Sequence, residues 1–284
     1  MDGILIVNKD KGITSFDVIR FLRKKFNIKK IGHAGTLDPL ATGVLVVLIG
    51  SATKLSDYVM SEKKTYEATI SIGEAYDTED STGKLIEKVL INEPLEVDST
   101  LEKILNLEYQ TPPMYSALKV DGKKLYELAR KNLEIERNVR KIEIFDIKRT
   151  SDVLYYDNMI EFKYKVTVSK GTYIRSLCVE IGKILGYPAH MKELNRIESG
   201  KFNIKDSYTL KDIENGEYKI LPNISIFDKE LICEIDENTY QKVTNGVPII
   251  KQDKREIIVF TYKHNLIGIY KKEKGVYKAE RVWN

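Results

Sequence analysis

One acidic residue, Asp38, lies in a loop whose composition suits a nucleophile. The loop, residues 32–43, contains three glycines and runs directly into the apolar segment 44–49. Pro39 restricts Asp38 to extended backbone geometry, and the glycines allow a ligand to approach closely. A carboxylate held at the end of a buried strand can act as a nucleophile or a general base. The alternative is an Asp-Pro turn in which the carboxylate bonds its own backbone.

Arg175, Tyr66 and Tyr173 could complete a site around such a carboxylate. Arg175 presents a fork of donors that suits a buried carboxylate, or it is a surface arginine on a helix. Tyr66 and Tyr173 could each stack on a nucleic-acid base, or they pack in the core. The residue types alone leave both interpretations open.

His33 and Lys9 are further candidates for contact with RNA. His33 could stack or hydrogen-bond in RNA, although a lone histidine is more often structural, and Lys9 could contact a phosphate or be solvated. Two cysteines without CxxC spacing and three scattered histidines predict no metal site. No P-loop, Rossmann, HExxH or GxSxG motif is present, so nucleotide hydrolysis, dinucleotide chemistry and serine hydrolysis have no support.

The segments that would position these residues mix strands and helices. Alternation predicts a strand over 66–72, with Tyr66 on its apolar face, and another over 162–168. Helical spacing of Phe16, Ile19, Leu22 and Phe26 predicts a helix, and Thr172 is expected to cap a second helix with Arg175 in its first turn. Further strands are expected at 4–7, 44–49, 114–120 and 142–147. The fold class is therefore α+β, with a largely antiparallel sheet.

The C-terminal part of the chain has a different pattern. From about residue 225, short apolar runs recur about every ten residues between turn signals, which predicts a small all-β module. We expect two domains, residues 1–224 and 225–284. Residues 1–64 carry 11 basic and 6 acidic side chains, residues 74–108 carry 3 and 10, and residues 240–284 carry 10 and 4. Such segregation suits a polyanion ligand, although solvated surfaces also carry charge runs.

Length and composition limit the class of protein. A chain of 284 residues with 42% hydrophobic and 31% charged residues is typical of a folded globular protein. The longest apolar run has six residues, Val44–Ile49, whereas a membrane span needs about 20. The N-terminus lacks the pattern of a secretory signal. We therefore expect a cytoplasmic protein without a membrane anchor.

Several segments together resemble the TruB family of tRNA pseudouridine synthases. The segment GHAGTLDPLATGVL, residues 32–45, is similar to the signature that contains the family's aspartate, here Asp38. The segments NKDKG (8–12), KTYEATISIG (64–73) and SKGTYIRSL (169–177) follow in the family's order, as do residues 112–130 and 189–202. The resemblance covers about residues 1–220, and the C-terminal segment resembles the PUA-like module of bacterial members less closely.

The resemblance implies a fold, an activity and a set of site residues. The fold would be that of pseudouridine synthases, a mixed, largely antiparallel sheet flanked by helices, with a PUA-like RNA-binding module at 225–284. The activity would be isomerisation of uridine 55 in the T loop of tRNA, with base flipping and no cofactor. Asp38 would be the nucleophile, Arg175 its partner, and Tyr66 the residue that stacks on uracil. His33, Tyr173, Leu194 and Lys9 would contact the substrate.

Two alternatives to a stand-alone enzyme remain from the sequence. One is a non-catalytic protein that binds or folds RNA on the same scaffold. The other is a guide-RNA-dependent pseudouridine synthase, a class that tends to carry additional terminal segments for protein partners. We expect a monomer that acts on the tRNA T arm, without an obligatory protein partner.

Overall fold

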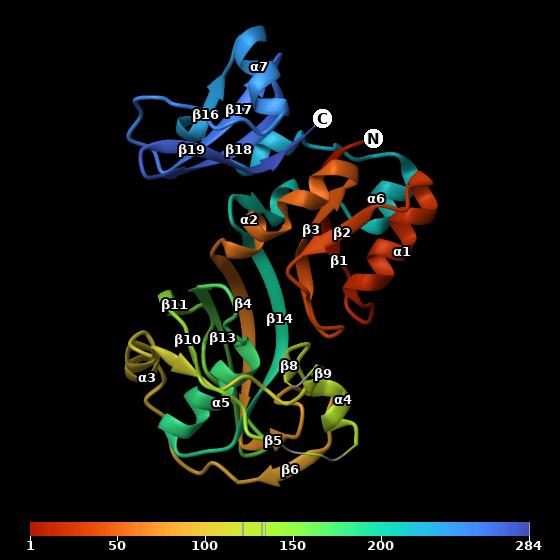
Figure 1. The fold of residues 1–284 in the computed structure, drawn as a ribbon. Helices are drawn as coiled ribbons and strands as arrows, with labels where there is room; N and C mark the ends of the chain where they lie inside the picture. The colour runs from red at the N-terminus through yellow and green to blue at the C-terminus, as the bar shows by residue number, and fades with distance from the viewer. Residues whose placement is uncertain (121, 132, 134, 284) are drawn as a thin grey trace.

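The computed structural model describes residues 1–120, 122–131, 133 and 135–283. A large mixed sheet runs through the molecule, and a separate four-stranded sheet lies near the C-terminus (Figure 1). The order of the main strands is β1 (Gly3–Lys9), β3 (Thr42–Ile49), β14 (Ala189–Ser199), β4 (Lys64–Ile72), β13 (Met159–Val168) and β11 (Ile144–Arg149). At its sides the sheet gains β2 (Ile31–Ala34), β12 (Leu154–Tyr156) and β15 (Phe202–Asn203).

All strand pairs that the structure describes in this sheet are antiparallel except one. β3 and β14 run parallel, and they pair through Thr42 with Asn195 and Gly43 with Arg196. By contrast, β1 pairs with β3, and β4 with β13, along most of their lengths. The expected α+β fold with a mixed, largely antiparallel sheet is therefore confirmed.

The strands β1 and β3 form the centre of a first lobe and are buried on both faces. One face packs on α1 (Ser15–Phe26) and α6 (Leu210–Asn215). The other packs on α2 (Ser56–Ser61) and on the C-terminal sheet. Burial on both faces explains why the strand sequences are uninterrupted apolar runs. The predicted apolar face of α1 is partly wrong, because Val18, Ile19 and Leu22 are buried whereas Phe16 is exposed.

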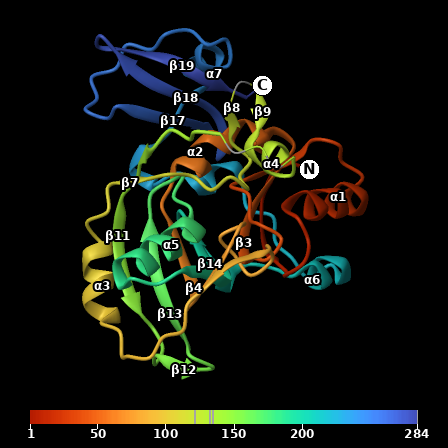
Figure 2. The same ribbon diagram turned by 90° about the horizontal axis from the view of Figure 1, so that it is seen from below.

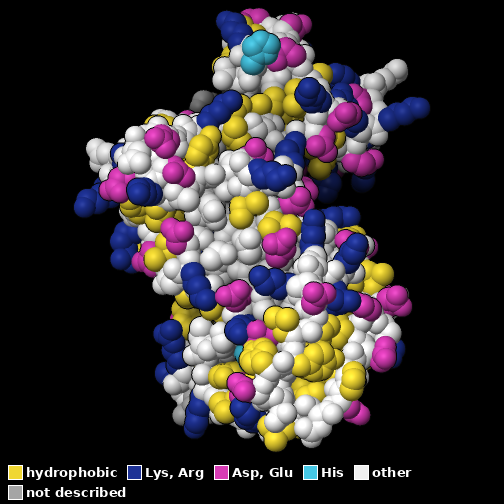
Figure 3. Space-filling model, turned by 180° about the vertical axis from the view of Figure 1, so that it is seen from behind, with side chains coloured by type: hydrophobic (Ala, Val, Ile, Leu, Met, Phe, Trp, Pro, Cys, Tyr) yellow, Lys and Arg dark blue, Asp and Glu magenta, His cyan; other side chains and the backbone are white. Residues whose placement is uncertain are grey.

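A second lobe consists of β4, β13 and β11, with helices on one face only. Figure 2 shows α5 (Ile174–Leu185) and α3 (Val97–Ile104) against this face. Tyr66, Ala68 and Ile70 point toward that side and are buried, as alternation predicts. Glu67 and Lys163 lie on the opposite, open face, where Figure 3 shows basic and acidic side chains side by side.

The structure corrects two expectations about local structure and adds one strand that was not expected. Residues 114–120 do not form a strand over their length, because only Lys119–Val120 pairs, as β8, with β9 (Lys123–Lys124). The N-cap of α5 is Tyr173 rather than Thr172, whose hydroxyl donates to the carbonyl of Ser169. The long strand β14 was not expected as a strand at all.

Smaller elements complete the two lobes. The acidic segment after β4 forms a hairpin of β5 (Glu74–Tyr76) and β6 (Leu85–Lys88). Between β6 and β11 along the chain lie β7 (Tyr109–Gln110), α4 (Leu125–Ala129) and β10 (Arg140–Lys141), besides α3 and the short hairpin of β8 and β9. Short 3-10 helices occur at Gly50–Leu55, Ile204–Asp206, Asn223–Ile226 and Lys229–Leu231.

The C-terminal sheet contains four strands and is accompanied by α7 (Glu237–Thr244). Its strands are β16 (Ile232–Glu234), β17 (Ile257–Tyr262), β18 (Asn265–Glu273) and β19 (Val276–Val282). Phe227 and Trp283 pack into the same apolar cluster as β1 and β3. The indole Nε1 of Trp283 also donates to the carbonyl of Ser51 at 3.3 Å. Burial of this apolar surface attaches the C-terminal sheet to the first lobe.

Candidate active site

The loop that carries Asp38 connects β2 to β3 and faces the second lobe. Lys9, at the end of β1, is fully buried beneath it. The Lys9 ammonium donates to the backbone carbonyls of Asp10 and Ile13 at 2.9 and 2.8 Å and of Pro39 at 3.5 Å. Burial lowers the pKa of Lys9 to about 8. Lys9 therefore holds the backbone next to Asp38 and is not a solvated side chain.

A buried arginine, Arg196 on β14, joins both ends of the same loop. Its guanidinium donates to the carbonyl of Gly35 at 2.9 Å and to that of Val44 at 2.7 Å. Gly43 has a positive φ, and a Cβ there would lie 2.3 Å from the carbonyl oxygen of Arg196. Only glycine allows β14 to approach this closely. The loop is thus fixed from β14 as well as from β1.

Asp38 forms an ion pair with Arg175 across the two lobes. Arg175 Nε lies 3.0 Å from Asp38 Oδ2. The remaining nitrogens of the guanidinium donate to the carbonyls of Thr78 at 3.0 Å and Tyr115 at 2.9 Å. Arg175 is buried in the first turn of α5, as the sequence predicts, whereas the side chain of Asp38 is 39% exposed. The pair therefore holds one side of the carboxylate and leaves another side open.

A second carboxylate, Asp80, lies behind the same guanidinium. Its Oδ2 is 4.0 Å from Arg175 Nε, and the side chain is buried. Asp80 Oδ1 accepts hydrogen bonds from the hydroxyls of Thr78 and Thr82 and from the backbone N–H of Thr82. Sequence reasoning missed this residue because it lies in an acidic, turn-rich stretch. The Thr-x-Asp-x-Thr spacing, which supplies two hydroxyls to one carboxylate, was the available signal.

The surroundings of Asp38 act on its pKa in both directions. Burial raises the pKa above the ordinary value of 3.8, the Arg175 guanidinium lowers it, and the charge of Asp80 raises it. Arg175 thus opposes the effect of burial and favours the ionised carboxylate. The nearby charge of Lys9 acts in the same direction as Arg175.

Tyr66, Tyr173 and Leu194, the other residues expected at the site, come from three different elements of the chain. Tyr66 on β4 and Leu194 on β14 are buried in the apolar cluster that also contains Leu37 of the Asp38 loop. Tyr173 precedes α5 and is half-buried, with its backbone N–H and carbonyl both bonded to the side chain of Gln110. Burial raises the pKa of Tyr173. Tyr173 lies near the carboxylate, because the charge of Asp38 also raises the Tyr173 pKa. Tyr66 and Leu194 belong to the same core cluster as Leu37.

His33 lies on β2, five residues before Asp38 in the chain. Its ring is half-buried, and Nδ1 has no hydrogen-bond partner among the described residues. Burial lowers the pKa of His33, and the charge of Arg196 adds to this effect. The lowered pKa favours the uncharged ring, and its Nδ1 is enclosed by protein rather than open to a ligand.

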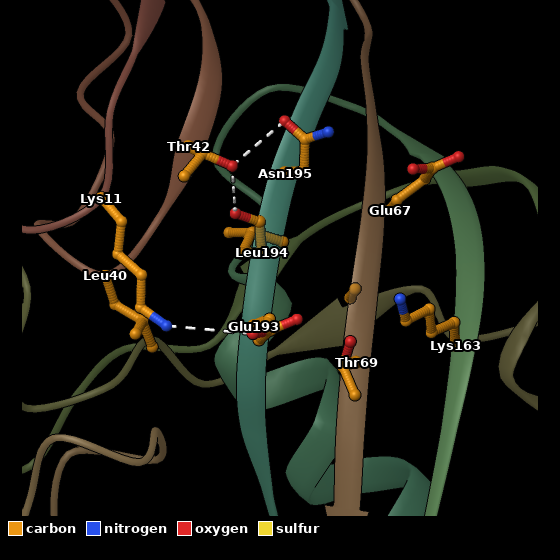
Figure 4. Close-up of a pocket in the computed structure, with 10 residues that line it drawn as sticks. Lys11, Leu40, Thr42, Glu67, Thr69, Lys163, Glu193, Leu194 and Asn195 are labelled. Carbon is orange, nitrogen blue, oxygen red and sulfur yellow. Dashed lines mark hydrogen bonds and ion pairs between the residues drawn. The ribbon is translucent and has the colours of Figure 1, made fainter.

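A pocket of about 280 Å³ lies on the open face of the sheet, apart from the Asp38–Arg175 pair. Figure 4 shows Lys11 and Leu40 on one side of it and β14, β4 and β13 on the other. Lys11 pairs with Glu193 at 3.9 Å across this space. The pocket is lined by both basic and acidic side chains, and neither Asp38 nor Arg175 lines it. The ion pair therefore lies outside this pocket, although Leu194, one of the expected substrate contacts, lines it.

Two further features of the described residues bear on the class of protein. No group of three or more His, Cys, Asp or Glu side chains could hold a metal ion in this part of the chain. Within the same residues, no helix has the length and apolar character needed to cross a membrane.

Comparison with solved structures supports the fold. A chain in the structure of an H/ACA RNP bound to a substrate RNA containing 2'-deoxyuridine matches with a TM-score of 0.70 at 22% identity, covering 99% of this chain and 85% of that one. A chain of a Cbf5-Nop10-Gar1 complex matches with a TM-score of 0.68 at 25% identity, covering 99% and 84%.

Comparison with curated proteins gives much higher identities. A protein named tRNA pseudouridine synthase B from Staphylococcus saprophyticus is 43% identical over 286 residues, which cover 95% of this chain and 94% of the relative. One of the same name from Staphylococcus haemolyticus is 46% identical over 268 residues, covering 90% and 88%. The family model for the TruB family pseudouridylate synthase N-terminal domain matches residues 23–174, and that for the tRNA pseudouridylate synthase B C-terminal domain matches residues 175–221. The chain therefore belongs to the TruB family of pseudouridylate synthases, a family of isomerases.

Proposed function

We propose that this protein converts uridine to pseudouridine at position 55 in the T loop of tRNA. The observation that carries the proposal is the half-exposed Asp38 carboxylate held at 3.0 Å by a buried arginine, within the region that matches the family. In the reaction the N1–C1′ bond of the nucleotide breaks and a C5–C1′ bond forms. C5 loses a proton and N1 gains one. Atoms and electrons balance within the substrate, so no redox cofactor is required.

Asp38 is the proposed nucleophile of this reaction. Its exposed side can approach the substrate, while Arg175 holds the other side and favours the ionised form that a nucleophile needs. Attack at C1′ of the sugar or at C6 of the base would both use the same carboxylate oxygen. Arg175 donates to three acceptors and is thus fixed in orientation, which preorganises the carboxylate.

The target base must leave the RNA stack to reach Asp38, so we propose base flipping. Tyr66 is the proposed stacking partner of the uracil, and Tyr173 and Leu194 would line the base pocket. The exposed part of the half-buried His33 ring would contact the disrupted loop of the RNA. Lys9 supports the Asp38 loop from within, so its proposed contribution is to position the loop beside the substrate rather than to hold a phosphate.

The substrate is proposed to be whole tRNA, bound without a guide RNA. Support comes from relatives named tRNA pseudouridine synthase B at 43–46% identity, whereas the H/ACA and Cbf5 structures reach only 22–25%. We further propose that residues 1–224 are the catalytic domain and residues 225–284 a PUA-like module that grips RNA phosphates. The enzyme is proposed to act in the cytoplasm as a monomer.

The test is single-turnover conversion of an unmodified tRNA transcript, without guide RNA, followed by mapping of pseudouridine. The native protein is expected to modify position 55, and Asp38→Asn to form no detectable product, because a carboxamide is a poor nucleophile. Asp152→Asn, the same change at an exposed acid of the second lobe, serves as the control.

Each possible failure of that assay has a distinct meaning. Native-like conversion by Asp38→Asn would remove Asp38 as the nucleophile. Tight tRNA binding by an inactive native protein would favour an RNA-folding role. Activity only after addition of a guide RNA would favour the guide-dependent class.

A further inference from the structure

An aromatic ring, Phe16, is exposed at the start of α1. Its spacing with Ile19 and Leu22 predicts burial, yet the side chain is 56% exposed. Exposure of a large apolar ring is not required by packing, since Val18, Ile19 and Leu22 already form the buried face of the helix. The ring is therefore available to a ligand.

Two arginines of the same helix flank this ring. The guanidinium carbon of Arg20 lies 5.6 Å from the ring centroid of Phe16, and that of Arg23 lies 6.0 Å away. Arg23 is also bonded to the carbonyl of Ile31 at 2.8 Å, which fixes its position. Arg20 is 3.2 Å from Asp17, an exposed pair that contributes little stability. An aromatic ring with flanking arginines is a common platform for nucleic-acid bases and phosphates.

This platform is next to the loop that carries Asp38. The hydroxyl of Ser15, the residue before Phe16, accepts from the Leu37 N–H at 2.9 Å and donates to the Leu37 carbonyl at 3.1 Å. Phe16 and Asp38 are each one Cα step of about 3.8 Å from this hydrogen-bonded pair. A nucleotide adjacent to one bound at Asp38 can therefore reach Phe16.

The charge around the platform favours RNA over a protein ligand. Asp17 is the one acidic residue of α1, whereas four basic residues lie on the helix. The chain continues from the helix into Lys29 and Lys30. A strongly basic surface with an exposed ring suits a polyanion with flat, stackable groups.

We propose that Phe16 stacks on an unpaired base of the bound RNA, close to the target nucleotide, and that Arg20 contacts the adjoining phosphate. This inference rests on the proposed function, because it takes the RNA at Asp38 as given. Stacking on a phenyl ring does not read base identity, so the subsite holds the RNA strand in place rather than selecting its sequence.

The experiment measures binding of unmodified tRNA transcript to the full-length protein. Phe16→Ala is expected to weaken affinity by roughly 5-fold to 150-fold, the range for loss of one base–aromatic stack. Phe16→Trp is expected to retain affinity, and its added indole should lose fluorescence when RNA binds. The native chain, whose single tryptophan Trp283 is buried, gives the background signal. Arg20→Gln should flatten the dependence of affinity on salt by about 0.7–0.9 in log-log slope.

Tyr155→Ala is the matched control. Tyr155 is 54% exposed, close to the exposure of Phe16, but it lies on β12 at the far end of the second lobe from α1 (Figure 2). Its substitution is expected to leave RNA affinity unchanged.

Three outcomes would overturn the inference. Native affinity in Phe16→Ala would show that the ring does not contact RNA. Native affinity for tRNA in Phe16→Leu would show that the side chain makes an apolar contact without stacking, the kind of contact that a protein ligand makes. Fluorescence of Phe16→Trp that RNA does not change would exclude a stacked base. Pseudouridine formation by the native protein is measured in the same preparation, so a failure of the proposed function is recognised separately from a failure of this subsite.

Discussion

Removal of Arg175 gives a sharp test of how the protein prepares Asp38. The two groups are 3.0 Å apart. Unit charges at that distance attract by about 1.4 kcal/mol in bulk water and by about 5.5 kcal/mol at an effective dielectric constant of about 20. Because Asp38 is 39% exposed, solvent screening places the pair between these limits. Arg175→Gln should therefore shift the acid equilibrium of Asp38 toward the protonated form by about 10-fold to 10⁴-fold.

The assay is the single-turnover rate of pseudouridine formation from about pH 5 to about pH 9. A nucleophilic carboxylate is active when ionised, so the rate should rise with pH as Asp38 loses its proton. Burial already raises the pKa of Asp38, and loss of Arg175 removes the group that opposes this effect. The rise should therefore occur at higher pH in Arg175→Gln. Arg175→Lys keeps the charge and should show a smaller displacement, with a lower maximal rate because lysine lacks the fork of donors.

Arg149→Gln is the control for this experiment. Arg149 also pairs with a carboxylate, Asp98, through two nitrogens at 2.8 Å, but on the outside of the second lobe. Its loss should leave the pH dependence unchanged. If folded Arg175→Gln has the same pH dependence as the native protein, Arg175 does not stabilise the Asp38 carboxylate and the reasoning fails.

Three other perturbations test separate parts of the structure. Tyr66→Leu should lose nearly all turnover and remain folded, because it loses a stack worth about 1–3 kcal/mol. Tyr66→Phe should be milder if stacking dominates. Full activity of the leucine variant would mean that Tyr66 is a core residue only. Burial lowers the pKa of Lys9 from 10.5 to about 8, so the unfolded chain binds more protons between those values and stability should rise with pH across that window. Urea unfolding should show a smaller rise in Lys9→Met, and an equal rise would contradict a buried ammonium. The double change Lys271→Gln and Lys274→Gln should reduce the salt slope of tRNA binding by about 0.7–0.9 per contact; an unchanged slope would show that these exposed lysines of the C-terminal sheet do not touch RNA.

Strands and helices with regular side-chain patterns could be predicted from the sequence. The strict alternation around Tyr66 and the apolar run at 44–49 both correspond to strands in the structure. Prediction failed for β14, where register shifts at Met191/Glu193 and Arg196/Glu198 break the alternation. A buried arginine inside that strand further disguises it, because arginine is rarely buried without partners.

The candidate site was predictable only where single residues stand out by type. Asp38 and Arg175 could be proposed from their local sequence, and the structure brings them together across the two lobes. Asp80 could not, since its importance depends on a guanidinium that is 95 positions away in the chain (175 − 80). The exposure of Phe16 was equally hidden, because helical spacing does not reveal which apolar residues exceed the width of the buried face.

The parallel seam between β3 and β14 has a mechanical consequence. The strands within each lobe are joined along most of their lengths, whereas the lobes share only two paired positions at this seam. Backbone pairing between the lobes is therefore short, and side chains of both lobes that share one apolar cluster add to the attachment. Asp38 lies in the loop beside this seam, and Arg196 on β14 bonds both ends of that loop. Because Arg196 and the Asp38–Arg175 pair both bridge the lobes beside this seam, the groups that hold the nucleophile also help to join the two lobes.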